Sequence, residues 1–119
     1  MTDHAGKEAP LFVQCMAIAK WLFENLRGPT VLVEAVQRDA LRLLDDVVLA
    51  LANIDRDENI LRADEAATLL RVHLRLAADL GALEERQLVF VTGELDGIGR
   101  QIGGWQRRRA QGTSEGRHR

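Results

Sequence analysis

The chain has 119 residues, of which 46% are hydrophobic and 29% are charged, and its formal net charge is −2. A chain of this length forms one domain, and this balance excludes an intrinsically disordered protein and a collagen. Because Cys15 is the only cysteine, a disulfide scaffold is excluded as well. Aromatic residues make up only 4% of the chain and there are two prolines, so the composition favours helices over strands.

The net charge is distributed unevenly along the chain. Residues 1–106 contain 11 Lys and Arg against 17 Asp and Glu, which gives −6, whereas residues 107–119 contain five Arg and one Glu, which gives +4. An acidic body with a basic tail points to an anionic partner for the tail. Arginine also outnumbers lysine by 14 to two, which suits contacts with carboxylates or phosphates, although a GC-rich genome is the simpler explanation.

The N-terminal residues and the apolar runs indicate where the protein resides. Residues 1–8 include several charged side chains and do not resemble a signal peptide. The longest apolar run, residues 47–52, is too short to span a membrane. Cys15 lies in an apolar run and is interpreted as a small core residue. We therefore expect a soluble, cytoplasmic protein.

The first half of the chain predicts two amphipathic helices. The first begins near Pro10 and ends before Gly28-Pro29, and Thr30 is a candidate cap for the second, which extends to about residue 53. Apolar residues recur at spacings of three and four in both helices, as one face of a helix requires. The main stripes consist of Leu11, Cys15, Ile18, Leu22 and Leu26, and of Val33, Val36, Ala40, Leu43, Val47, Leu51 and Ile54.

The second half predicts two more helices. The third begins near Asp55 or Asp57 as N-cap and ends at Gly81, and the fourth begins at a Glu84 cap with Gln87 at its third helical position. Their main stripes consist of Ile60, Ala63, Ala67, Leu70, Leu74 and Ala77, and of Leu88, Val91, Leu95, Ile98, Ile102 and Trp105. Residues after Arg109 show no such pattern and are expected to be disordered.

Three short connections between long helices predict an all-α, antiparallel up-down-up-down four-helix bundle. The expected organisation is a flexible N-terminus over residues 1–9, a bundle over residues 10–107 and a basic disordered tail over residues 108–119. The apolar stripes on the first three helices are two rows wide, which indicates either a thick core or self-association.

The predicted fourth helix is unusually rich in glycine. Five of the ten glycines of the chain fall within it, and each costs about 1 kcal/mol relative to alanine in a helix interior. Gly93 and Gly97 lie one turn apart, a spacing that lets another helix approach closely. Gly103 and Gly104 are interpreted instead as the end of the helix, with Trp105 packing back onto the bundle.

The sequence offers no constellation of catalytic or metal-binding residues. A di-iron bundle needs Glu-x-x-His pairs, but the residue three before His73 is Leu70. His73 is therefore expected at the surface or at its boundary, and no phosphate-binding loop or nucleophile with a base is recognisable. We predict that the protein is not an enzyme and requires neither a metal nor a cofactor.

Two stretches of the second half resemble the accessory variability determinant (Avd) family, whose members accompany the reverse transcriptases of diversity-generating retroelements. These stretches are residues 69–88 (LLRVHLRLAADLGALEERQL) and residues 95–105 (LDGIGRQIGGW). The resemblance covers roughly residues 10–107, and the wider group of four-helix bundles includes proteins encoded in intervening sequences of ribosomal RNA. It implies a homopentameric ring that binds the reverse transcriptase and its template RNA.

The resemblance, together with the basic tail, nominates the binding residues. The candidates for nucleic-acid or partner binding are Arg71, Arg75, Arg86, Arg100, Arg107, Arg108 and Arg109. The candidates for helix packing or oligomer contacts are Gly93, Gly97 and Trp105. A simpler interpretation pairs Arg75 with Asp79 and Arg100 with Asp96, each across one helical turn.

Two functions remain open from the sequence, and a third, a bundle that binds a small molecule or a metal, has no recognisable ligand set. One is a non-enzymatic oligomeric accessory protein that binds a reverse transcriptase and RNA. The other is a homo-oligomeric adaptor that binds protein only and has no nucleic-acid role.

Overall fold

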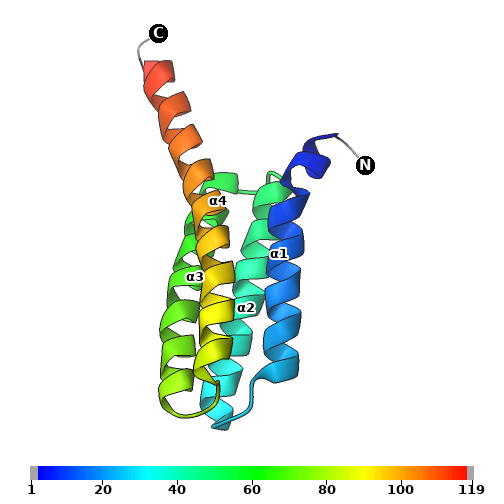
Figure 1. Cartoon of the computed structure of the whole chain (residues 1–119). Helices are drawn as coiled ribbons and strands as arrows, with labels where there is room; N and C mark the ends of the chain where they lie inside the picture. Colours follow the sequence, from blue (N-terminus) through cyan, green and yellow to red (C-terminus); the bar gives the residue numbers. More distant parts are fainter. Residues whose placement is uncertain (1–2, 118–119) are drawn as a thin grey trace.

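The computed structural model is an antiparallel bundle of four helices: α1 (Asp3–Asn25), α2 (Thr30–Leu51), α3 (Arg56–Asp79) and α4 (Glu85–Arg117) (Figure 1). The structure describes the backbone of residues 3–117 and the side chains of residues 10–108. Each helix packs against the next and α4 also packs against α1, whereas no Cα atoms of the diagonal pairs lie within 8 Å of each other. The predicted all-α four-helix bundle is confirmed, and the described residues contain no strand.

One hydrophobic core runs along the axis of the bundle. Leu22, Val47, Leu74 and Leu95, one from each helix, are all 0% exposed. Burying a side chain of this size stabilises a fold by about 1.5–3 kcal/mol. The predicted stripes of the first, third and fourth helices lie in this core. In the second helix the prediction is wrong at its ends: Ile54 is 50% exposed, Val33 and Leu51 are only partly buried, and Leu32 and Ala50 are buried instead.

Two helices end with a residue in the left-handed conformation. Gly81 has a φ of +80°, and its N–H donates to the carbonyl of Ala78 (3.1 Å), while the N–H of Ala82 donates to the carbonyl of Ala77 (2.8 Å). This pair of bonds is a Schellman motif, which satisfies carbonyls at the end of α3. Asn53, with a φ of 59°, has the same role after α2. The sequence predicted helix ends at Gly81 and at about residue 53, but not the left-handed conformation of Asn53.

The predicted start of the fourth helix is confirmed. The backbone N–H of Glu84 donates to Oε1 of Gln87 (2.9 Å), which is one half of a capping box. Leu83 and Leu88, which flank this cap in the positions of a hydrophobic staple, are both buried. The connection between α3 and α4 is therefore fixed at both ends.

The predicted cap of the second helix is wrong. Thr30 is already the first residue of α2, and Pro29 occupies the cap position with no side-chain hydrogen bond. The fixed φ of proline, here −56°, is compatible with the helix start, although its ring offers no acceptor for the free N–H groups of the first turn. At α3, Asp55 does occupy the predicted cap position, but its φ is 41° and its side chain makes no cap bond.

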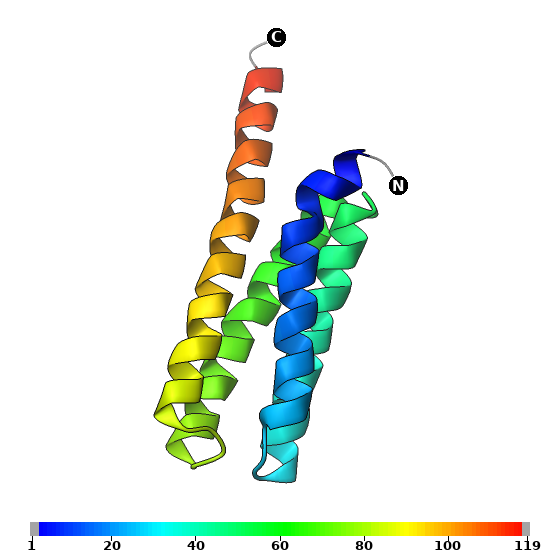
Figure 2. The ribbon, with the colours of Figure 1, turned by 45° about the vertical axis from the view of Figure 1, so that its right-hand side comes forward.

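The outer helices extend beyond the bounds predicted from the sequence. The backbone of α1 is helical from Asp3, with Pro10 inside the helix, and the backbone of α4 is helical to Arg117. Figure 1 shows the first turns of α1 leaning away from the rest, as a proline inside a helix causes. Figure 2 shows α4 continuing beyond the other helices. The side chains expected to be flexible, in residues 1–9 and 109–119, lie outside the described part.

Candidate functional site

Three of the candidate arginines form ion pairs with carboxylates. Arg71 joins α3 to α4, whereas the other two pair with acids on or beside their own helix. The N···O distances are 2.5 Å for Arg71 and Asp96, 3.4 Å for Arg75 and Asp79, and 3.5 Å for Arg86 and Glu84. All three pairs are at least partly exposed, so each contributes about 0–1 kcal/mol to stability.

These pairs decide between the two interpretations of the arginines. The predicted pairing of Arg75 with Asp79 is confirmed. The predicted pairing of Arg100 with Asp96 is wrong, because Arg71 from the neighbouring helix takes that carboxylate. The charge of each paired arginine is largely balanced, which makes Arg71, Arg75 and Arg86 weak attractors for an anion.

Arg100, Arg107 and Arg108 differ from the paired arginines. All three are exposed on α4, and none has a carboxylate within ion-pair distance among the residues whose side chains are described. The guanidinium groups lie close to the glycines of the helix: Nη1 of Arg107 is 3.3 Å from the position of a Cβ on Gly103. The side chain of Arg109 lies outside the described residues.

The glycine pair at the centre of α4 does not receive another helix within the chain. A Cβ on Gly93 would meet nothing within 4 Å, so this position faces open space. A Cβ on Gly97 would lie 3.0 Å from Nε2 of Gln14, a side chain of α1. That amide also donates to the backbone carbonyl of Glu94 (3.2 Å) and to its carboxylate (3.1 Å). Close approach therefore occurs at Gly97 alone, and through a side chain.

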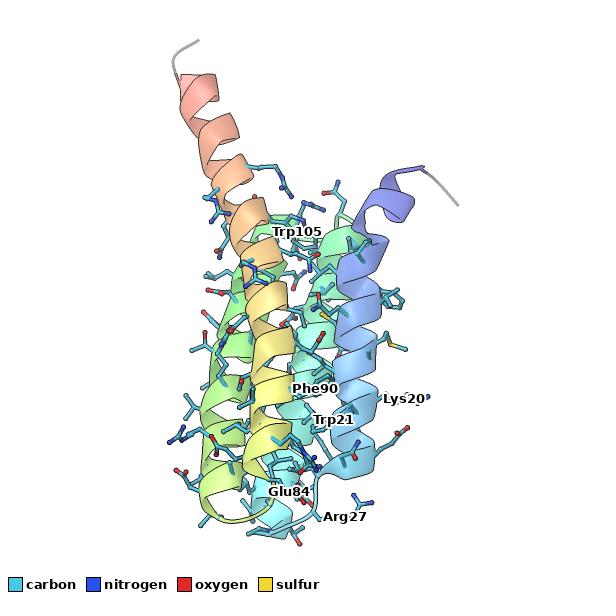
Figure 3. The ribbon with its side chains drawn as sticks, viewed as in Figure 1. Lys20, Trp21, Arg27, Glu84, Phe90 and Trp105 are labelled. Carbon is cyan, nitrogen blue, oxygen red and sulfur yellow. The ribbon has the colours of Figure 1, made fainter. Side chains whose placement is uncertain are left out.

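Trp105 closes one end of the core. It is only 6% exposed, as its place in the predicted apolar stripe of this helix requires. The interpretation of Gly103 and Gly104 as the end of the helix is wrong, because α4 continues through them to Arg117. Cζ of Arg56 lies 4.9 Å from the centre of its ring, which is a cation–π contact between the start of α3 and α4. Arg56 also donates to the carbonyl of Ala50 at the end of α2 (2.8 Å). Figure 3 shows Trp105 above Phe90 and Trp21, whose rings lie 5.5 Å apart between α1 and α4.

Large apolar side chains are exposed on two faces beside α2. The α1/α2 apolar face consists of Phe12, Met16, Phe23, Leu41 and Val48, which are 37–46% exposed. Phe23 and Leu41 line one shallow groove, so the two rows adjoin. The α3 apolar face consists of Leu69, Val72, Leu76 and Leu80, which are 45–59% exposed. The second apolar rows of the sequence therefore face outward and do not thicken the core.

A buried acid lies between α2 and α3, where the sequence indicated none. Asp39 is 2% exposed, and one of its carboxylate oxygens contacts Nδ1 of His73. Both residues lie at helical spacing beside core positions: Asp39 is three residues after Val36, and His73 is three after Leu70. That spacing is the signal that could have identified the pair. The predicted boundary position of His73 agrees with its half-buried side chain.

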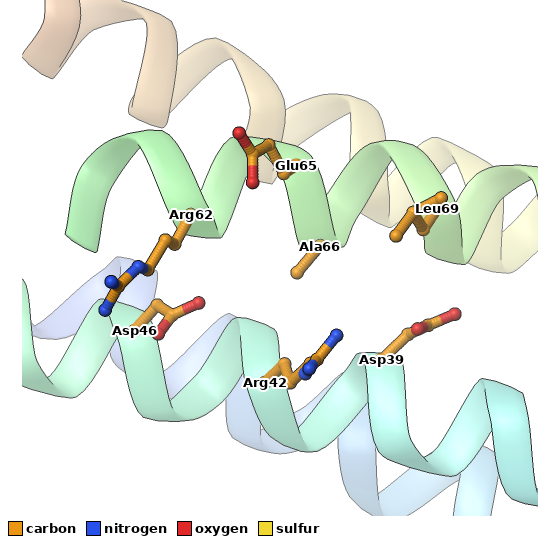
Figure 4. Close-up of a pocket in the computed structure, with 7 residues that line it drawn as sticks. All are labelled: Asp39, Arg42, Asp46, Arg62, Glu65, Ala66 and Leu69. Carbon is orange, nitrogen blue, oxygen red and sulfur yellow. The ribbon is translucent and has the colours of Figure 1, made fainter. Parts of the chain in front are cut away.

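A groove of about 380 Å³ opens beside the buried acid, as Figure 4 shows. Its walls carry both signs of charge and come from α2 and α3: Asp39, Arg42, Asp46, Arg62, Glu65, Ala66 and Leu69. Burial raises the pKa of the Asp46 carboxyl above its usual value, partly opposed by the nearby guanidinium of Arg62. Arg62 itself pairs with Glu58 (2.8 Å). The groove therefore presents three carboxyl groups and two guanidinium groups, and one guanidinium is shared with Glu58 outside it.

The described residues do not assemble a recognisable reaction centre. Cys15 is buried, and burial raises the pKa of its thiol to about 12, so it is not a thiolate nucleophile at neutral pH. Within the part searched, no group of three or more His, Cys, Asp or Glu side chains is placed to hold a metal ion. Nor does any helix there combine the length and apolarity that crossing a bilayer requires.

Comparisons with known proteins identify no relative. No model of a protein family, no curated protein and no solved structure matches the chain. The resemblance to the accessory variability determinant family therefore depends on residues 69–88 and 95–105 alone.

Proposed function

We propose that this chain is a non-enzymatic, self-associating helical scaffold that accompanies the reverse transcriptase of a diversity-generating retroelement and binds its RNA. The observation that carries the proposal is the pair of exposed apolar faces, one on α1 and α2 and the other on α3. Contiguous exposed apolar surface on a soluble domain marks a site of association.

The two apolar faces differ in composition and lie on different helices. The α1/α2 apolar face includes Phe12 and Phe23, whereas the α3 apolar face consists of Leu and Val only. A contact that joins two different faces of identical chains is heterologous, and repeated heterologous contacts build rings when the rotation closes. This arrangement supports the homopentameric ring that the sequence resemblance implies.

The nucleic-acid role is assigned to the end of α4. Arg100, Arg107 and Arg108 are exposed and have no carboxylate partner among the described side chains. Affinity for nucleic acid depends on cations that neutralise phosphates and release counterions. In a ring, the exposed arginines at the end of α4 would be repeated in every subunit, and their positive charges would add.

A second candidate function is an oligomeric adaptor that binds protein only. Residues 1–106 have a net charge of −6, which favours the adaptor function, because an acidic body repels phosphates. The ion pairs of Arg71, Arg75 and Arg86 favour it too, since they leave fewer free cations. The apolar faces are common to both functions.

Self-association is tested by the mass in solution of the Leu76→Glu variant. Leu76 is 46% exposed, so a glutamate at this position leaves the core intact and places a charge in the α3 apolar face. Thr68→Glu is the matched control, because Thr68 is an exposed residue of the same helix outside that face. Light scattering is expected to show a smaller particle for Leu76→Glu alone, and equal masses for both variants and wild type would contradict the proposal.

The accessory role is tested by copurification with a reverse transcriptase encoded beside the gene, in the presence and absence of RNA. Capture of the enzyme together with RNA supports the first function. Capture of the enzyme without any RNA binding, at low salt as well as at high salt, supports the adaptor instead.

A further inference from the structure

The side chains of Arg107 and Arg108 converge on one bare position of α4. A Cβ on Gly104 would lie 3.5 Å from Nη1 of Arg108 and 3.9 Å from Nη2 of Arg107. Nη1 of Arg107 also lies 3.3 Å from the position of a Cβ on Gly103. Nitrogen atoms of both guanidinium groups therefore lie within van der Waals reach of the same bare position of the helix.

Two cations that converge in this way attract an anion. Each guanidinium repels the other, and no carboxylate among the described side chains pairs with either of them. By contrast, Arg71 of α3, which lies beside Gly99 of α4, is paired with Asp96. A phosphate accepts several hydrogen bonds from arginine forks and would relieve the repulsion over Gly104.

The surroundings of Gly104 suit a nucleic acid better than a protein. The exposed large apolar residues of α4 are Val89 and Phe90, near its start, and none follows Phe90 in the described part of the helix. Protein interfaces have an apolar core, whereas nucleic-acid interfaces are more polar and more positive. Arg100 lies seven residues before Arg107, on the same side of the helix and about 10.5 Å away along its axis.

We propose that Arg107 and Arg108 clamp one phosphate of an RNA strand over Gly104, and that Arg100 contacts another phosphate of the same strand. The inference rests on the proposed function, because that function supplies the RNA, and it assigns the contact to a defined place on α4. A Cβ alone would fit at position 104, at ordinary contact distance from both guanidinium groups, but a longer side chain there would compete with the phosphate for the same nitrogen atoms.

The test compares Gly104→Gln with Gly93→Gln in the full-length protein. Glutamine adds no charge and favours a helix, so neither variant is expected to lose stability. Gly93 is the matched control, because a side chain there meets nothing within 4 Å and no arginine lies over it. Binding is measured by fluorescence anisotropy with a labelled oligouridine RNA at two salt concentrations, and folding is checked by circular dichroism.

Gly104→Gln is expected to weaken RNA binding about three- to tenfold, while Gly93→Gln binds as the wild type does. The double variant R107Q/R108Q removes both arginines that hold the one clamped phosphate. It is expected to bind more weakly still and to reduce the slope of log affinity against log salt by about 0.7, the value for one phosphate of a single strand.

The contrary outcomes are distinct. If both Gly104→Gln and R107Q/R108Q bind RNA with wild-type affinity, the clamp is overturned. RNA would then bind elsewhere on the chain, and the proposed function would stand. No RNA binding by the wild type at low salt would overturn both. Stronger competition by polyglutamate than by unlabelled RNA would also overturn the clamp, because it would identify an acidic protein as the partner.

Discussion

Removing His73 while Asp39 stays in place is expected to destabilise the bundle strongly. Asp39 is 2% exposed, and His73 is the partner that its carboxylate contacts across α2 and α3. His73→Ala therefore leaves a buried charge without its hydrogen-bonding partner, which costs about 3–5 kcal/mol when a buried pair is broken. Because Arg42 lines the same groove and can move toward the carboxylate, the lower figure is expected.

Replacing both Asp39 and His73 distinguishes the cost of an unpaired buried carboxylate from the loss of the contact between the two side chains. Asp39→Leu/His73→Leu removes the buried carboxylate and fills the space with apolar atoms, and such a replacement is often neutral or stabilising. Urea unfolding followed by circular dichroism, at one fixed protein concentration, gives the free energy of unfolding of each variant. A loss below about 1 kcal/mol for His73→Ala, or an equally large loss in the double variant, would refute the reasoning.

Three further predictions follow from single residues. Gly81→Ala is expected to lower the free energy of unfolding by about 1–2 kcal/mol, because φ at this position is +80°. Asn53→Gly, at a φ of 59°, should be neutral or slightly stabilising in the same urea assay. Cys15 is expected to react with a thiol reagent at pH 8 only as fast as the chain opens, since its pKa is raised to about 12, and rapid labelling of the folded protein would contradict its burial. Because the pKa of Asp46 is raised, the folded state binds its proton more tightly than the unfolded chain does, and the ionised carboxylate destabilises the fold above the folded pKa. Asp46→Asn should therefore raise the melting temperature at pH 7. This gain should vanish as the pH falls below the unfolded pKa of 3.8.

The core and the helix boundaries that depend on local chemistry could be predicted from the sequence. Leu74 and Leu95 were assigned to the core by spacing alone, and Gly81 and Gln87 were recognised as the end of one helix and the start of the next. Spacing and capping act within a turn or two, so a single sequence contains the whole signal.

Contacts between helices could be predicted only in part. The sequence predicts that Arg100 pairs with Asp96, one turn away, but in the bundle Asp96 pairs with Arg71 of α3. Asp39 and His73 are likewise 34 positions apart, and their contact depends on how α2 and α3 are aligned. Alignment along the helix axis is set by the packing of the whole core, which pairwise spacing in one helix does not encode.

The exposure of the two apolar faces also could not be predicted from the sequence. The sequence indicated that the stripes were wide, but a thick core and a second, exposed face produce the same pattern. The positions of the neighbouring helices decide between them, and Phe12, Phe23 and Leu76 lie outside the enclosed core.

The mass of the full-length protein in solution tests the central claim most directly. The chain has a mass of 13.3 kDa, and a scaffold built through its two apolar faces is predicted to give a stable particle at a whole multiple of that mass, five for a homopentameric ring. Native mass spectrometry and light scattering across a range of concentrations measure it. A monomer of 13.3 kDa at every concentration would contradict the account.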